Sequence, residues 1–151
     1  MRRLDSPDFS AYSPFMARAL LLLALPLLVV SCATRKSMMA RPLDEGVTAD
    51  YEAPFDKVKR AAYDSLADLA FTVKDEKWDA RDSNAYVVTS SQGLSTGSTG
   101  RYARIVIEKT ETKQKVYVLV ESKAAVRDAA TVDEIIAKDL LGRIDKRILG
   151  K

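Results

Sequence analysis

Few side chains in this sequence could carry catalytic chemistry. Its 151 residues include no histidine, one cysteine, and 24 basic against 21 acidic side chains. The lack of histidine excludes a His-Asp-Ser relay, a histidine-ligated zinc ion and a histidine general base. A charge balance this close to neutral argues against nucleic-acid binding, which needs a concentrated basic face. The single cysteine, Cys32, excludes an internal disulfide and needs a separate explanation.

Two polar clusters could bind an ion, but neither has the spacing that such a site needs. The Gly-, Ser- and Thr-rich residues 93–101 are not spaced as GxxxxGK[ST], and the strand expected after them places no helix N-terminus against an anion. The carboxylates from Asp75 to Asp82 surround Trp78, but they lack the DxDxDG order of a calcium loop and alternate with basic residues. We interpret the first cluster as a strand connection, with a binding loop as the alternative, and the second as solvated charge. The sequence therefore predicts no catalytic residue, no metal site and no cofactor, and the protein is not expected to be an enzyme.

An apolar run near the start of the chain has the features of a secretory signal. Residues 19–30 are apolar apart from the interruption at Pro26. The run is shorter than the roughly 20 residues of a membrane-spanning helix and suits a signal h-region. Arg18 and two earlier arginines supply the positive region before it. We therefore predict a signal peptide over residues 1–31, with Met16 as an alternative true start.

The end of this run, Val29, Val30, Ser31 and Cys32, resembles the lipobox of bacterial lipoproteins, although the commonest version begins with Leu. The resemblance implies cleavage between Ser31 and Cys32, a thioether-linked diacylglycerol on Cys32, and an acyl chain such as palmitate on its amine. Each buried methylene contributes about 0.8 kcal/mol, so two or three chains make attachment effectively permanent. Ala33 follows the cysteine instead of the aspartate typical of inner-membrane retention, which implies the periplasmic face of the outer membrane. The alternative is a plain signal peptide with an incidental cysteine.

The segment behind the cysteine shows no sustained period. It contains Arg35, Lys36, Arg41 and Pro42. We predict that residues 32–46 are a lipidated cysteine and a flexible tether, whose fourteen coil residues would span roughly 20 Å. The basic residues could contact anionic head groups, but charges in a linker are more often solvated. The domain behind the tether should lie close to the membrane.

Strand-like and helix-like patterns follow. Alternating apolar residues predict a strand at 47–52, and Pro54 suits the first turn of a helix over 54–70, where apolar residues recur at steps of three and four. Thr131 and Glu134 are spaced as a capping box, which predicts a second helix with Thr131 as its N-cap and Gly150 just past its end. Runs rich in β-formers predict strands at 71–77, 85–89, 101–109 and 115–123.

These elements follow the order β-α-β-β-β-β-α. No βαβ repeat forces a parallel sheet, and short connections favour antiparallel pairing. We therefore predict a single α+β domain over residues 47–151, with an antiparallel sheet and both helices packed on one face.

The hairpin over 101–123 is more apolar than a half-exposed sheet needs. One of its faces is fully apolar and should meet the helices. The other carries Tyr102, Val106, Tyr117 and Leu119, more apolar side chains than a face left to water requires. We predict that these four residues form a partner surface on the open sheet face. The alternative is that they pair across the strands and only stabilise the sheet.

The run from Tyr51 to Val58, together with the helix, strands and closing helix after it, resembles small uncharacterised bacterial lipoproteins over most of the mature chain. The element order is also similar, more distantly, to the helix-grip domains of the C component of the outer-membrane β-barrel assembly machine. Neither resemblance brings a catalytic motif. We expect a non-enzymatic, membrane-anchored periplasmic module of the cell envelope that acts through a protein partner. The alternative is a protein that binds a small apolar or lipid ligand between its helices and its sheet.

Overall fold

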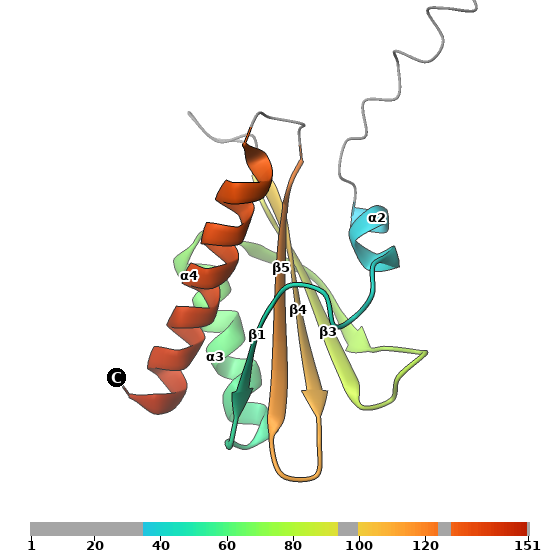
Figure 1. Cartoon of the computed structure of the whole chain (residues 1–151), viewed down its shortest axis with the longest axis vertical. Coiled ribbons are helices and arrows are strands. Elements are labelled where there is room, and N and C mark those ends of the chain that lie inside the picture. Colours follow the sequence, from blue (N-terminus) through green and yellow to red (C-terminus); the bar gives the residue numbers. More distant parts are fainter. Residues whose placement is uncertain (1–34, 94–99, 124–127, 151) are drawn as a thin grey trace, which may run out of the picture. The chain divides into compact units, whose positions relative to one another are not determined.

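The computed structural model describes residues 35–93, 100–123 and 128–150 (Figure 1). The described helices and strands all belong to one compact unit, Cys32–Lys151. The predicted signal peptide, the predicted lipidation site at Cys32 and most of the glycine-rich loop lie outside the described residues. Among the described helices, none has both the length and the apolar character needed to cross a membrane.

Five strands form one antiparallel sheet in the order β1-β5-β4-β3-β2. The hairpin of β4 and β5 lies at the centre of the sheet, with Val106 opposite Tyr117. The first strand pairs with the last at one edge, and a bulge between Val73 and Asp75 interrupts the ladder at the other edge. The strands are β1 Val47–Tyr51, β2 Thr72–Trp78, β3 Ala85–Gln92, β4 Arg101–Lys109 and β5 Gln114–Ser122.

Two helices, α3 (Phe55–Asp68) and α4 (Ala129–Leu149), cover one face of this sheet (Figure 1). Their apolar stripes pack onto the inward side chains of the strands, so that Leu66, Ile105, Leu140 and Ile144 are at most 1% exposed. Burying a side chain of this size contributes about 1.5–3 kcal/mol. The interior between helices and sheet is therefore filled and supplies most of the stability.

A third helix, α2 (Arg35–Ala40), lies on the opposite side of the sheet (Figure 1). Its Met38 is 1% exposed, and the chain continues from it to β1 through Gly46. A Cβ at Gly46, where φ is +124°, would lie 2.3 Å from the carbonyl oxygen of Val118, so only glycine fits there. We call residues 35–46 the strap. The prediction of a flexible tether is wrong for these residues, because they pack against the sheet.

The predicted fold class is confirmed: the chain forms an α+β layout with one antiparallel sheet and two long helices on one face. The predicted start of the second helix is wrong. That helix begins at Ala129 with Asp128 in the N-cap position, and no side chain caps it. Thr131 therefore lies inside the first turn and Glu134 lies beyond it. The third predicted strand is also longer than expected and extends to Gln92.

Candidate functional site

The strap is held by one buried arginine in the middle of the sheet. Arg104 is 1% exposed. Its Nη1 donates to the carbonyl oxygens of Met38 (2.9 Å) and Arg41 (3.1 Å), and its Nη2 donates to that of Pro42 (2.6 Å). Burial lowers the pKa of the Arg104 guanidinium, an effect opposed by the charges of Glu45 and Glu121. An arginine nevertheless stays protonated in proteins, so a buried cation binds the backbone of the strap.

The predicted partner surface lies on this same face, and the strap covers part of it. Val106 is 1% exposed and Tyr117 is 7% exposed, and both pack with Met39 and Leu43 of the strap. For these two residues the prediction of an open surface is wrong, because the chain itself covers them.

The other two predicted surface residues, Tyr102 and Leu119, are half-buried. The Nζ of Lys123 lies 4.9 Å from the Tyr102 ring centroid, and Leu119 stands opposite Arg104 in the hairpin. The four predicted residues thus share one face but do not form a continuous exposed patch. The additional apolar side chains that the sequence shows on this face mainly form the surface against which the strap packs.

A different surface has the properties of a binding site. Phe55, Trp78 and Tyr86 form a cluster of aromatic rings, which we call the aromatic cluster. The ring of Trp78 stacks on Phe55 with centroids 5.3 Å apart and 22° between planes, and meets Tyr86 edge-on at 5.1 Å. Phe55 is the first residue of α3, and Trp78 and Tyr86 stand opposite each other on β2 and β3. Trp78 remains 43% exposed, so an indole that packs against two other rings faces solvent.

Cationic side chains surround the aromatic cluster. The Nζ of Lys109 lies 4.9 Å from the Phe55 centroid and 5.4 Å from the Trp78 centroid. The Nζ of Lys59 lies 4.5 Å from the centroid of Tyr86. Such contacts stabilise the packed rings by about 0.5–1 kcal/mol each at exposed sites.

A hydrogen-bonded network connects Lys59, Tyr86 and Glu76. Tyr86 donates to Glu76 Oε2 (2.5 Å), Lys59 donates to the Tyr86 hydroxyl (2.8 Å), and Lys59 forms an ion pair with Glu76 (3.3 Å). The hydrogen bond to Tyr86 raises the pKa of Lys59, and the hydrogen bond from Tyr86 lowers the pKa of Glu76. Burial, followed by the hydrogen bond to Glu76, raises the pKa of Tyr86. Every shift moves a pKa away from neutrality, whereas a general acid or base works best with a pKa near the operating pH.

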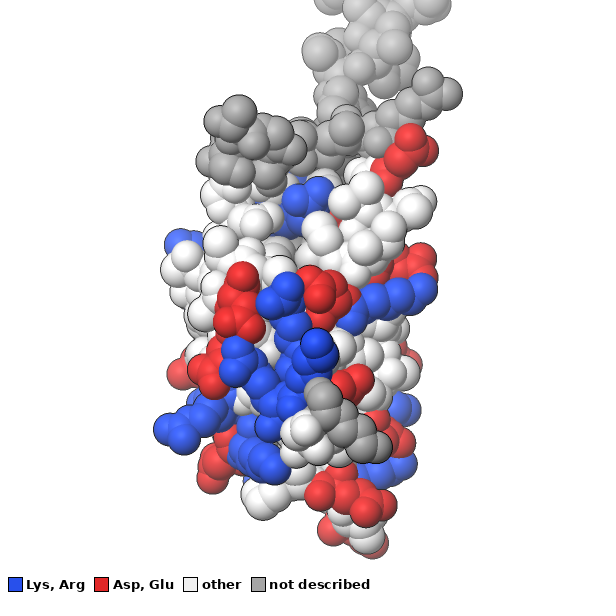
Figure 2. Space-filling view, turned by 90° about the vertical axis from the view of Figure 1, so that its left-hand side faces the viewer, with Lys and Arg blue, Asp and Glu red and all other residues white. Residues whose placement is uncertain are grey.

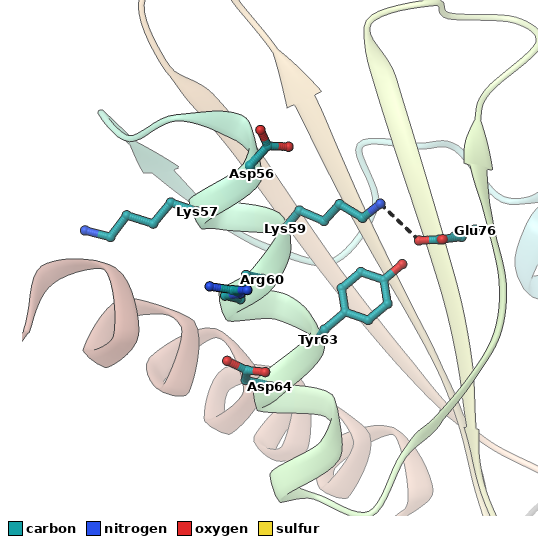
Figure 3. A pocket seen from close by; sticks show the side chains of 7 residues that line it. All are labelled: Asp56, Lys57, Lys59, Arg60, Tyr63, Asp64 and Glu76. Atoms are coloured by element: carbon teal, nitrogen blue, oxygen red, sulfur yellow. Dashed lines mark ion pairs between the residues drawn. The ribbon is translucent and has the colours of Figure 1, made fainter.

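A shallow groove of about 780 Å³ runs from this network over the outer surface of α3 (Figure 3). Lys59 and Tyr63 point from the helix toward Glu76 on β2, and Lys57 points to the other side. The hydroxyl of Tyr63 is buried without a hydrogen-bond partner in the described part of the chain. The groove is lined by three basic residues, three acidic residues and one tyrosine: Lys57, Lys59, Arg60, Asp56, Asp64, Glu76 and Tyr63.

Charges on the helix-covered side are mixed. Figure 2 shows basic side chains gathered over the helices with acidic side chains beside them. Ion pairs connect Arg147 with Asp68 (2.6 Å) and Arg143 with Asp139 (3.2 Å). Across the described residues, no group of three or more Cys, Asp or Glu side chains is placed to hold a metal ion.

The sequence did not reveal the aromatic cluster. It placed Trp78 among solvated charges, and the three rings come from segments up to 31 residues apart in the chain. The pairing of two aromatic residues at the ends of adjacent strands is the signal that could have found it, provided the register between the strands was known.

No protein-family model matches the chain, and no curated protein is significantly similar to it.

Proposed function

We propose that this chain is a lipid-anchored, non-enzymatic binding module of the bacterial cell envelope, with its anchor on Cys32. The lipobox-like residues Val29 to Cys32 carry the anchor in this proposal. The module would be held at the periplasmic face of the outer membrane and bind an envelope protein.

The observation that carries the binding role is the exposed Trp78, whose ring packs on Phe55 and Tyr86. Tryptophan and tyrosine are enriched among the residues that dominate binding energy, and an immobilised ring loses little entropy when a partner arrives. The network beside it, in which the pKa values of Lys59, Glu76 and Tyr86 all move away from neutrality, favours binding over acid–base catalysis. We therefore place the partner site at the aromatic cluster and the groove beside it, and no longer at the strap-covered sheet face.

A small ligand between helices and sheet has less support. The space that it would occupy is filled by side chains such as Leu66, Ile105 and Leu140, each at most 1% exposed. A bound ligand would have to displace several of these at a cost of about 2–5 kcal/mol for each large side chain moved.

The anchor is tested by metabolic labelling of cells with a palmitate analogue. Cys32→Ala should abolish the label, because the chain has no other cysteine to receive the thioether lipid. Ser37→Ala, a nearby change that leaves Cys32 in place, should be labelled like the unaltered chain. Persistent labelling of Cys32→Ala would contradict the lipidated cysteine.

The partner site is tested by photo-crosslinking from two exposed apolar positions. A photoreactive amino acid at Trp78 should give a discrete crosslinked adduct in intact cells. The same group at Ile135, which is 60% exposed on α4, should give none or a different one. Identical adducts from both positions, or none from position 78, would argue against a site at the aromatic cluster.

A further inference from the structure

We propose that the corner of the domain formed by Arg35, Lys36, Lys74 and Lys77 lies on the membrane surface and binds anionic phospholipid head groups. We call these four residues the basic corner. The inference rests on the lipid anchor of the proposed function, and it adds which side of the domain faces the bilayer. Its partner is a lipid surface, not a protein.

Chain length brings the basic corner to the membrane. Only three residue steps separate Cys32 from Arg35, which allow at most about 11 Å between their Cα atoms. The strap cannot extend this reach while it is docked, because Met38 is buried and Arg104 holds its carbonyl oxygen. An expected tether of fourteen residues is thus reduced to two, Ala33 and Thr34, and the first fixed part of the domain is α2 itself.

The basic corner is built around the carboxylate of Asp75 on β2. Arg35 forms an ion pair with Asp75 (2.7 Å), and Lys77 approaches the same carboxylate (3.8 Å). Lys36 and Lys74 are the sequence neighbours of Arg35 and Asp75, and both are exposed.

The basic corner carries an excess of positive charge. Two of its four cations, Arg35 and Lys77, form ion pairs with Asp75, and Lys36 and Lys74 add two exposed positive charges next to these residues in the sequence. The next acidic residue of the strand, Glu76, stands opposite Val88 on the helix side of the sheet and forms an ion pair with Lys59 there. The basic corner, which the strap brings to the bilayer, therefore has a net charge that complements anionic lipid.

The expected strength follows from charge and proximity. Each Lys or Arg near an anionic membrane increases binding by about fivefold, and the attraction falls off within a Debye length of about 10 Å at 0.1 M salt. The anchor holds the basic corner inside this distance, so association is intramolecular and needs no high affinity of its own. The binding should be present on anionic bilayers, weak on neutral ones, and reversed by salt.

The experiment uses residues 32–151, the compact unit that contains every described element, coupled through the thiol of Cys32 to a maleimide lipid in vesicles. Vesicles of phosphatidylcholine alone are compared with vesicles that contain one third phosphatidylglycerol. An amine-reactive reagent then modifies exposed lysines, and mass spectrometry gives the rate at each position. On the anionic vesicles, modification of Lys36, Lys74 and Lys77 should slow at least fivefold and recover at 0.5 M salt, whereas Lys138 and Lys146 on α4 should be unaffected.

Matched charge reversals complete the test. Replacing Lys36, Lys74 and Lys77 by Glu should remove the effect of anionic lipid on the distance between Trp78, the only tryptophan, and dansyl-labelled lipid, measured by energy transfer. Lys138→Glu with Lys146→Glu should retain it. Equal lysine rates on both vesicles, or protection of the α4 lysines instead, would overturn the proposal. Absence of palmitate labelling of the unaltered chain in cells is a separate result that would contradict the proposed anchor and leave the vesicle measurement standing.

Discussion

Removal of the Arg104 guanidinium should release the strap without unfolding the domain. In Arg104→Met the three carbonyl oxygens of Met38, Arg41 and Pro42 lose their donors. Hydrogen bonds to a charged group are worth about 1.5–3 kcal/mol each, and several kcal/mol of desolvation cost are recovered when the buried cation is removed. The expected net loss is about 2–4 kcal/mol, which increases the ratio of open to docked strap by roughly 30- to 900-fold.

A buried thiol measures this ratio directly. In a Cys32→Ser background, Met38→Cys places the only thiol where the native side chain is 1% exposed. Its reaction with a disulfide reagent should accelerate by at least thirtyfold when Arg104→Met is added. Arg60→Met, which removes an exposed arginine from α3, is the matched control and should leave the rate unchanged. An acceleration below threefold with Arg104→Met would refute the reasoning, since apolar burial alone would then hold the strap.

Two further changes test other parts of the fold. Asp133→Ala should lower the free energy of unfolding, measured in urea, by about 2–4 kcal/mol. Asp133 accepts hydrogen bonds from the backbone N–H and the hydroxyl of Ser122 (both 2.7 Å), and its removal leaves these buried donors unpaired. A loss below 1 kcal/mol would mean that water satisfies the donors. The side-chain hydrogen bond from Arg81 lowers the pKa of Asp79 from 3.8 to about 2. The unfolded state therefore binds more protons between these values, and the stabilisation, no more than about 2 kcal/mol, is complete above pH 4 and lost as pH falls toward 2. Urea unfolding measured at a series of pH values should show that the stability difference between the unaltered chain and Asp79→Asn shrinks as the pH falls from 4 toward 2. A difference that stays constant would contradict the assigned cause.

The sequence was sufficient to predict the helices and strands in which apolar residues recur at a regular spacing. The steps of three and four from Phe55 onward predicted α3, and the alternation around residues 101–123 predicted the central hairpin, because in both the side chains that match the period are buried. These patterns depend on neighbours close in the chain, which a sequence displays directly.

The strap and the cap of α4 could not be read from the sequence, because distant residues decide both. Residues 35–46 have no period of their own, and α2 is stabilised by Arg104, more than 60 positions later. Nothing marks an arginine between two apolar residues of a strand as a partner for backbone carbonyls. Likewise, Thr131 and Glu134 have capping-box spacing, but α4 begins earlier, at Ala129. Asp133, between them, accepts a hydrogen bond from Ser122 at the end of β5.

The position of β1 has a consequence for the order in which the chain folds. Val47 pairs with Val118, about 70 residues later in the chain, and a loop of that length makes closure slow because its entropy must be lost before the contact forms. At the sheet edge, β5 is the one neighbour of β1. The first strand therefore stays unpaired until the central hairpin exists, and the strap can dock only on a β4 that is already in place. The strap and β1 come first among the described elements of the chain, and they are thus expected to be the last to pack.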